Sequence, residues 1–327
     1  MKVSVRLLKT VEEVREITSE WKTLLERSDC HQVFSSIVWY LVTLEVFTEF
    51  KPWVCVVEEQ GEVQGIAPLV INPVNHVSFL SDLADYQDFI VTRNDKKTVA
   101  QLFHALNNHK CFDKLSLSGL PDRSQLLSII DDGESLFDDI KFKINTCVNR
   151  CYYLDLSEGY DAYMKRFNAK ARSNFRRMTS KAKEQNIEMK ELFPEDISGD
   201  KVAEHFLRLH LFRFPDKLFS RKKPQQFCRR LLPLLFNKGL LRVFVLQQED
   251  RIIAIKLSVQ DTSGLGYWNG GFDTTFSSIA PGKLLMLYQI KICCDEGIKV
   301  FDLLRGEDPY KLEWQSGYKT IASVHLE

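Results

Sequence analysis

The same order of segments occurs twice in this chain of 327 residues, and this repeat limits the fold more than any other feature. The first copy begins with a hairpin that turns at Gln60 and Gly61, between two runs of β-branched and apolar residues. A third strand, a helix and a fourth strand are expected after it, at residues 76–80, 97–108 and 114–122.

The second copy repeats this order with similar lengths. Its hairpin turns near Glu249 and Asp250, and the third strand, the helix and the fourth strand are expected at residues 265–272, 284–297 and 300–308. An antiparallel hairpin followed by a helix that crosses to a parallel strand is a mixed α/β unit. The sequence therefore predicts an α/β protein in which a mixed sheet is built from two duplicated domains.

The boundary between the copies is expected near residues 145–155, where the apolar run CYYLDL starts the second one. We place the first domain at residues 1–148 and the second at 149–327, each with helices ahead of its hairpin. This length suits two cores of roughly 150 residues each. Because no low-complexity linker separates the halves, the domains are expected to share an interface.

Composition narrows the class of protein. The 44 basic and 44 acidic residues cancel, so global charge does not indicate a nucleic-acid-binding protein. The eight cysteines are scattered without a CxxC pair, which is typical of reduced thiols, and no metal is expected. No apolar run approaches the roughly 20 residues of a membrane span, and the N-terminus lacks a secretory signal. We therefore expect a cytoplasmic protein with no membrane partner.

An apolar strand pattern at residues 300–304 breaks abruptly into the charged run RGEDPYK. Strand ends in α/β proteins often lie on functional edges. Asp302 lies inside the apolar run, where a carboxylate must be paired or hydrogen-bonded, and Arg305 is its nearest expected partner. A structural ion pair and a catalytic carboxylate both remain open.

The helix of the second copy starts at SSIAPGK, with Pro281 and Gly282 in its first turn. Backbone N–H groups at a helix start have no internal partner and favour a phosphate or pyrophosphate group. Lys283 would add a positive charge, and the corresponding junction of the first copy has no glycine. An anion site is therefore expected in the second copy alone, with a plain start of a buried helix as the alternative.

These segments follow the order of the acyl-CoA-binding core of the GNAT N-acyltransferases. The run from GGFDTTFSSIAPGK to RGEDPYKLEW resembles the signature of the two-domain CelD-like branch, which is related to the FemAB-like transferases. The runs GIAPLVI, DYQDFI and LRLHLFRF resemble that branch more loosely. The chain departs from the family after His210, where FRFPDKLFSRKKPQQF replaces a loop that usually contains glycine.

The resemblance implies an N-acyltransferase that moves an acyl group, acetyl in the simplest case, from acyl-CoA to a primary amine of a small molecule. The amine would attack the thioester directly, in a cleft left where the last two strands of the second copy separate. The implied cofactor-binding residues are Pro281, Gly282, Lys283, Leu284, Arg305 and Lys311.

The candidate catalytic residues are Asp302, His210 and Tyr310. The candidates for removing a proton from the amine are Asp302, His210, Glu307 and Asp308. Tyr310 would donate a proton to the leaving thiolate or to the substrate. His210 lies on a helix with an apolar stripe, so a structural histidine is the alternative. The first two acidic residues of DYQDFI and the tyrosine between them would hold the ammonium of the acceptor. The substrate-binding candidates are Asp85, Tyr86, Asp88, Arg213, Trp268, Glu307 and Asp308.

The stretch from Met164 to Lys183 contains eight basic residues and no acidic one. A solvated helix face is the simplest interpretation, and binding to CoA phosphates or to RNA is the alternative. Because FemAB-like relatives take their acyl group from aminoacyl-tRNA, this stretch keeps a tRNA-dependent transferase open. A catalytically silent GNAT-like binding module is a third hypothesis. We expect a nucleic-acid partner only if tRNA is the donor, and a homodimer remains open.

Overall fold

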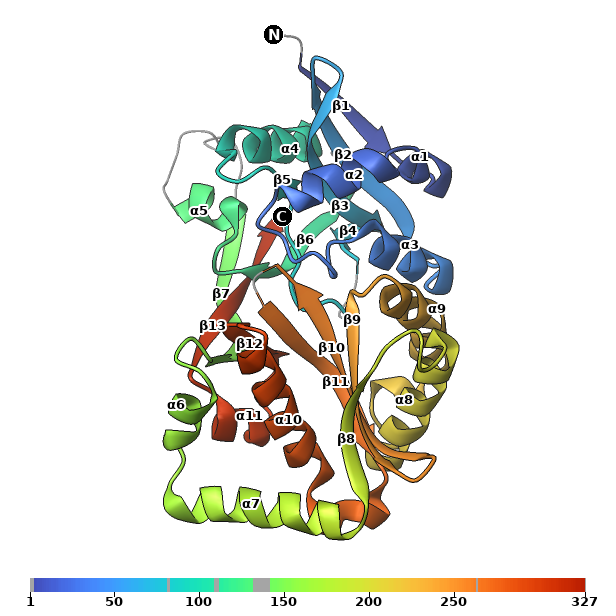
Figure 1. Ribbon diagram of the computed structural model, residues 1–327. Coiled ribbons are helices and arrows are strands. Elements are labelled where there is room, and N and C mark those ends of the chain that lie inside the picture. Colours follow the sequence, from blue (N-terminus) through green and yellow to red (C-terminus); the bar gives the residue numbers. More distant parts are fainter. Residues whose placement is uncertain (1–2, 81–82, 109–111, 132–141, 263, 327) are drawn as a thin grey trace. The chain divides into compact units, whose positions relative to one another are not determined.

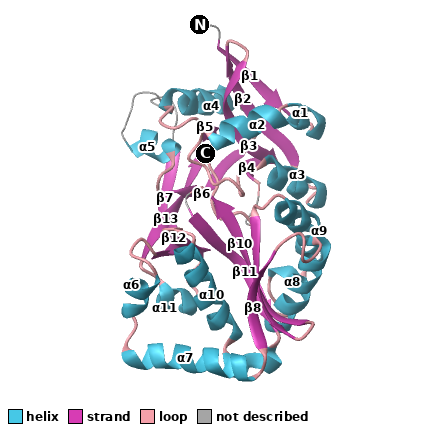
Figure 2. Ribbon diagram, in the orientation of Figure 1, coloured by secondary structure: helices cyan, strands magenta, loops and turns pink. Residues whose placement is uncertain are grey.

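The computed structural model describes residues 3–80, 83–108, 112–131, 142–262 and 264–326, with only the backbone at 131, 142–148 and 326. The chain forms two compact units of helices and strands (Figure 2), as predicted for a mixed α/β protein. The first unit comprises Met1–Cys151, Arg305–Glu307 and Lys319–Glu327, and the second comprises Tyr152–Leu304 and Asp308–Tyr318. The domain boundary between residues 148 and 149 stays a prediction.

The hairpin of the first unit has the turn that the sequence predicts. β2 (Lys51–Glu59) and β3 (Glu62–Ile71) pair antiparallel. Gln60 and Gly61 between them have φ angles of 56° and 86°. Two successive residues with positive φ match the right-handed twist of the flanking strands, which is why such turns are favoured in tight hairpins.

The strand order of the first unit confirms the predicted crossover. β4 (His76–Phe79) pairs antiparallel with β3, and α4 (Lys96–Asn108) leads to β6 (Lys114–Pro121), which pairs parallel with β4. Further strands of this unit have no counterpart in the prediction. They are β1 (Val3–Leu8) beside β2, β5 (Ile90–Val91) beside β3, and β13 (Gly317–Leu326) beside β6.

Helices cover both faces of the strands of the first unit (Figure 1). They are α1 (Val11–Glu16), α2 (Thr18–Glu26), α3 (Ile37–Val46), α4 and α5 (Gln125–Asp131). Successive strand residues point to opposite faces. Accordingly, Val54 of β2 lies in a core with Leu24 of α2, whereas the next residue, Cys55, lies in a core with Leu102 of α4.

The second unit repeats the hairpin, third strand, helix and fourth strand. The strands that follow β6 and precede β13 are β7 (Phe142–Asp155), β8 (Ile187–Leu192), β9 (Leu241–Gln248), β10 (Arg251–Asp261), β11 (Gly264–Phe272) and β12 (Val300–Arg305). β8, β9, β10 and β11 pair antiparallel in that order, and β12 pairs parallel with β11. The predicted fold of the second copy is therefore confirmed.

Helices also lie on both faces of the second unit's strands, with α8 on one side and α10 on the other (Figure 1). The helices are α6 (Tyr160–Lys165), α7 (Ala169–Glu184), α8 (Gly199–Arg213), α9 (Lys222–Asn237), α10 (Pro281–Asp295) and α11 (Pro309–Trp314), with 3-10 helices at Leu218–Ser220 and Thr274–Ile279. Two adjacent glycines of β11 show this arrangement. The Cβ position of Gly270 faces Tyr267 and Lys256, whereas that of Gly271 faces the α8 backbone at His210.

The parallel pairing of β11 with β12 is short. In the described residues it joins Leu265 to Phe301 and Gly266 to Asp302, and it does not continue toward Phe272. Beyond Gly266, β11 therefore keeps β10 as its strand neighbour on one edge while β12 leaves the other. The expected separation of the last two strands of this copy is confirmed.

Gly271→Ala should destabilise the protein, because a Cβ at this position would lie 2.3 Å from the backbone nitrogen of His210. Helix backbone cannot move aside as a flexible side chain can, so α8 would have to shift away from β11. We expect the free energy of unfolding to fall by about 1–3 kcal/mol, measured by urea denaturation.

Gly282→Ala is the matched control. A Cβ there meets no atom within 4 Å, and alanine favours a helix over glycine by roughly 0.5–1 kcal/mol. Equal stability of the two variants would show that α8 does not press on β11 at Gly271.

Candidate active site

The second unit contains a cavity of about 340 Å³, lined in part by the stretch of β11 that β12 leaves. Its other walls come from β10, the start of α10, α11 and the end of α8. The predicted site residues that line it are Arg213, Pro281, Gly282, Lys283 and Tyr310. Residues far apart in the sequence thus meet at one place within this unit.

The start of α10 opens into this cavity. The residue before the helix, Ala280, has a left-handed backbone with φ of 51°, and no side chain caps the first turn. The amides of Lys283 and Leu284 bond to the carbonyl of Ala280 at 3.0 and 3.2 Å. The amide of Gly282 is the one left for a ligand among these described residues, and open space lies where a Cβ would stand.

The side chains at the start of α10 differ in what they can offer a ligand. Lys283 forms an ion pair with Glu313, with 2.6 Å between Nζ and Oε1, and both side chains are exposed. An exposed pair of this kind is weak, so Lys283 could turn to an anion at little energetic cost. Leu284 is fully buried in the core, so its side chain supports the helix and does not line the cavity.

Lys256 on β10 lines the cavity, and the sequence reasoning did not identify it. Its side chain is 5% exposed. Its Nζ lies 4.1 Å from the ring centroid of Tyr267 and 3.9 Å from the sulfur of Met286. The signal that could have revealed it is a single lysine in the apolar run IIAIKLSV, since an inward lysine without a local acidic neighbour is rare.

Burial lowers the pKa of the Lys256 amine from its ordinary value of 10.5 to about 7. Removal from water disfavours the charged form, and no carboxylate in the described residues lies within ion-pair distance to offset that cost. A lysine in this condition can exchange a proton near neutral pH, which is typical of functional sites.

Tyr267, which contacts Lys256, meets a second tyrosine of the cavity, Tyr310. The rings of Tyr267 and Tyr310 meet edge to face with centroids 6.3 Å apart, and both line the cavity. Burial raises the pKa of Tyr267, and Asp308, exposed at the start of α11, raises it further. Tyr310 is 37% exposed, so it is the predicted catalytic residue that reaches solvent and cavity together.

His210 lies on the opposite side of β11, buried in α8. Its Nδ1 is 3.0 Å from the carbonyl oxygen of Gly270, and its buried Nε2 has no hydrogen-bond partner in the described residues. Burial lowers the pKa of His210, and the bond to Gly270 opposes this effect. The rings of Phe206 and Phe219 surround it, and Trp268 stacks on Phe206. The neutral ring is favoured here.

Asp302 and Lys311 hold the backbone of one strained residue, Leu304. This leucine has a left-handed backbone with φ of 58°, which a branched side chain rarely adopts. The Leu304 amide donates to Oδ1 of Asp302 at 2.7 Å, and Nζ of the buried Lys311 donates to the Leu304 carbonyl at 3.1 Å. These contacts explain why the apolar strand pattern breaks into charged residues at this point.

The next residues of the chain belong to the first unit. Arg305 forms an ion pair with Asp85, with 3.2 Å between Nε and Oδ1 and both side chains largely shielded. The Gly306 amide donates to the carbonyl of Arg150, whose side chain pairs loosely with Glu307 at 3.8 Å. The partner expected for Arg305 was Asp302, and the ion pair seen at Arg305 is with Asp85.

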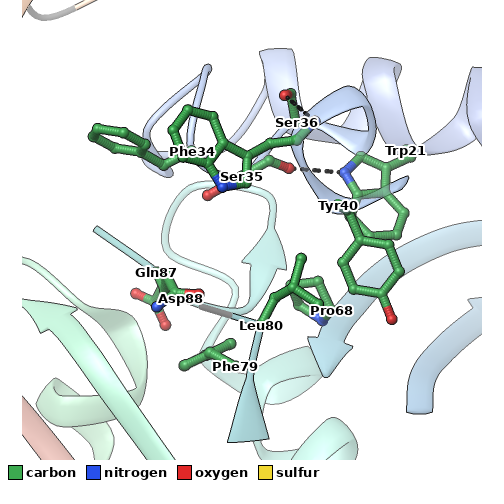
Figure 3. A pocket seen from close by; sticks show the side chains of 11 residues that line it. Trp21, Phe34, Ser35, Ser36, Tyr40, Pro68, Phe79, Leu80, Gln87 and Asp88 are labelled. Carbon is green, nitrogen blue, oxygen red and sulfur yellow. Dashed lines mark hydrogen bonds between the residues drawn. The ribbon is translucent and has the colours of Figure 1, made fainter. Parts of the chain in front are cut away.

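The other members of the DYQDFI run have separate surroundings. Tyr86 is buried and stacks on His31 with centroids 5.9 Å apart. Asp88 borders a small aromatic pocket with room for about 20 Å³, which Trp21 and Tyr40 also line (Figure 3). Burial raises the pKa of Asp88 to about 7, although hydrogen bonds from Ser124 and from a backbone amide act to lower it. The space suits one water molecule.

Most of the basic stretch, from Ala169 on, lies in α7, which is capped by Asn168, whose side chain accepts from the Ala171 amide. Phe175 and Ala182 are its buried residues, and the other faces carry the charge. The basic residues of α7 are Lys170, Arg172, Arg176, Arg177, Lys181 and Lys183. Nζ of Lys181 lies 3.5 Å from the carbonyl of Ser278, in the segment that leads into α10. The basic helix therefore borders the start of α10.

In the described part of the chain, no three His, Cys, Asp or Glu side chains gather as metal ligands would. None of the described helices combines the length and apolar character needed to cross a bilayer. The cysteines described there are free thiols, consistent with their scattered spacing.

Comparison with known proteins agrees with this geometry. The family model of the acetyltransferase (GNAT) domain matches residues 169–312. This segment runs from α7 into α11 and includes the hairpin, β11, α10 and β12. No curated protein matches the chain. The part of the second unit from α7 into α11 thus matches a GNAT-type domain.

Solved structures share the whole fold. The crystal structure of FemX has a TM-score of 0.68 at 11% identity and covers 99% of this chain and 97% of its own. The C-terminal DUF2156 domain of a putative lysylphosphatidylglycerol synthetase from Agrobacterium fabrum has a TM-score of 0.61 at 10% identity, with coverages of 96% and 92%.

A tandem GNAT protein from the clavulanic acid biosynthesis pathway has a TM-score of 0.50 at 11% identity, with coverages of 99% and 98%. At such low identity these likenesses concern the fold alone. They confirm a tandem GNAT-like architecture for this chain, and FemX is similar to it in fold. The narrower resemblance to the CelD-like branch stays a prediction.

Lys256→Met should stabilise the protein, most strongly at low pH. The unfolded chain holds the lysine proton up to about its ordinary pKa of 10.5, whereas the folded protein releases it near 7. Between these values the unfolded state binds more protons, so wild-type stability rises with pH, and the cost of burial is largest below about pH 7. The variant lacks that cost.

Urea denaturation at about pH 6 and about pH 10 measures this difference. We expect a gain on the order of a few kcal/mol at the lower pH and a much smaller one at the higher pH. Lys291→Met, at an exposed lysine of α10, is the control and should show little change. An equal effect of Lys256→Met at both pH values would contradict the lowered pKa.

Proposed function

We propose that this protein transfers an acyl group from acyl-CoA, bound in the cavity of the second unit, to the primary amine of a small molecule. The observation that carries the proposal is the uncapped start of α10, open at a cavity beside the part of β11 that β12 leaves. The match of residues 169–312 to the GNAT acetyltransferase domain supports it.

The cavity suits the parts of such a donor. An anionic group at the start of α10 would meet the amide of Gly282 and the positive end of the helix dipole. An extended arm could lie along the free edge of β11, where backbone groups can pair with it as a further strand would. The acyl group would then lie near Tyr267 and Tyr310.

The predicted catalytic residues receive different roles in this proposal. Tyr310 borders the cavity and would donate a proton to the departing thiolate. Asp302 and His210 hold backbone groups at Leu304 and Gly270, so we assign them positioning roles. Correct placement of the amine against the thioester carbonyl can itself supply several kcal/mol of the rate enhancement.

Acetyl-CoA should raise the melting temperature of the protein in a way that depends on Gly282. Binding at 100 times the dissociation constant stabilises the folded state by about 2.7 kcal/mol. Gly282→Trp should abolish the shift, because its side chain would fill the space before the first turn of α10. Gly282→Ala should retain most of it.

The same titration with longer acyl-CoAs and with free CoA would show which part of the donor is recognised. Transfer would be followed by release of the CoA thiol, with glucosamine, lysine, spermidine and glycylglycine as acceptors. A shift by acetyl-CoA that Gly282→Trp leaves intact would place the donor elsewhere. Binding without thiol release would favour a silent binding module.

A second candidate is a transferase that takes its acyl group from aminoacyl-tRNA. The observation in its favour is α7, whose exposed basic residues border the start of α10 through Lys181 and Ser278. A basic helix beside the donor cavity suits the phosphates of an RNA as well as those of CoA. The fold shared with FemX is compatible with either donor.

Binding of tRNA would distinguish this candidate. If tRNA is the donor, raising the salt concentration from about 50 to about 200 mM should weaken binding by at least about 10-fold. Replacing Arg176 and Arg177 together by Gln should weaken it as well, whereas Lys291→Gln on α10 should not. A melting shift with tRNA and none with any CoA would establish the second candidate over the first.

A further inference from the structure

The cavity wall holds a buried amine that the proposed function has not yet used. Lys256 lines the cavity from β10, and its side chain is 5% exposed. The neighbours of its Nζ are the ring of Tyr267 and the sulfur of Met286. A ring and a thioether are weak hydrogen-bond acceptors, so the strongest partner that this amine can find is a group that enters the cavity.

The charged and titratable groups that share the cavity with Lys256 include no acid. They are Tyr267 on β11, Tyr310 on α11, Lys283 on α10 and Arg213 at the end of α8. Lys283 already pairs with Glu313, and Asp308 acts on Tyr267. On β9, the neighbouring strand on the other edge of β10, the residue paired with Lys256 is the apolar Phe244. Nothing around the amine favours a permanent positive charge.

Two uses of such a lysine can be told apart. An anchor for an anionic group of the donor needs a permanent charge, which a lysine in this apolar wall does not keep. A proton acceptor needs an amine that is neutral when the substrate arrives and close to the reacting groups. The lack of a counter-charge, together with burial that brings the pKa to about 7, favours the second use.

We propose that Lys256 accepts the proton that the acceptor amine loses before it attacks the acyl group in the cavity. This inference rests on the proposed function. The acceptor ammonium gives one proton to the neutral Nζ of Lys256. The freed lone pair forms the bond to the acyl carbon, and the carbon–sulfur bond breaks. Tyr310 gives its proton to the departing sulfur and takes the second proton of the attacking nitrogen in its place. Lys256 returns its proton to water.

Replacement of Lys256 tests this role with two variants. Lys256→Met removes the amine, and Lys256→Arg keeps a charge that cannot be given up at neutral pH. Both should lower kcat by about 100-fold or more. The shift of the melting temperature with acetyl-CoA should remain in Lys256→Met, because donor binding does not use the amine. Lys291→Met is the control, as an exposed lysine on α10.

The pH profile of kcat/KM separates proton transfer from a purely structural role. Wild-type activity should fall as the pH drops through about 7, where Lys256 takes up a proton. The slower Lys256→Met variant should not show this fall in activity near pH 7. The pH dependence that comes from ionisation of the acceptor should be the same in both proteins. An Arg variant with wild-type rate, or a Met variant with unchanged kcat and pH profile, would overturn the proposal.

Labelling with a trace of acetic anhydride near pH 7 keeps the inference separate from the proposed function. Neutral amines react with the anhydride, so Lys256 should be labelled faster than Lys291, and bound acetyl-CoA should protect it. Labelling of Lys256 no faster than that of Lys291 would overturn the proposal even in an active enzyme. If the wild-type protein transfers no acyl group, the proposed function and the proton transfer to Lys256 are both overturned. Fast labelling in that case would still show that the Lys256 amine is neutral near pH 7.

Discussion

The backbone of Leu304 is the constraint on which the candidate active site depends. Its left-handed conformation would be unfavourable in an isolated strand, and contacts from Asp302 and Lys311 hold the amide and the carbonyl on its two sides. The chain therefore turns at this residue, one position before β12 ends at Arg305. The separation of β12 from β11, which leaves a strand edge beside the cavity, fits with this turn.

The cavity combines an uncapped helix start, a strand edge and an amine without a counter-charge. Each of these features would be costly in a structure that bound nothing, because polar groups gain stability when they are paired. A donor with an anionic group, an extended polar arm and a reactive carbonyl would pair with the first two. The acceptor would meet the third. The proposed pair of ligands would thus account for features that are otherwise unrelated in the sequence.

Local sequence signals predicted the repeated fold well. Alternation of apolar residues and turns such as Gln60-Gly61 specify hairpins through contacts between neighbouring residues. The start of α10 was predictable for the same reason, since Pro281 and Gly282 mark a helix start. The separation of the last two strands was expected from a family resemblance. The break in the apolar pattern after Leu304 indicated only where in the sequence it would occur.

Long-range contacts were beyond that reasoning. Nothing near Arg305 indicates that Asp85, more than two hundred positions earlier, is the acid it meets. Lys256 was a single lysine in an apolar run, but only its place opposite Gly270, which the local pattern does not give, brings it to the cavity. β13 was not predicted, because it is stabilised by pairing with β6, which is distant in the sequence and which the local pattern cannot reveal.

The pairing of β13 with β6 also affects how the protein can be made. The first unit contains Lys319–Glu327, so its sheet lacks one strand until β13, which follows the second unit in the sequence, is available. On the ribosome, the N-terminal half would emerge early and wait with the edge of β6 uncovered while the second unit is synthesised. An exposed strand edge invites pairing with other chains. The order of synthesis and the order of completion are therefore opposite for this unit, because its sheet can be completed only after β13 has been made.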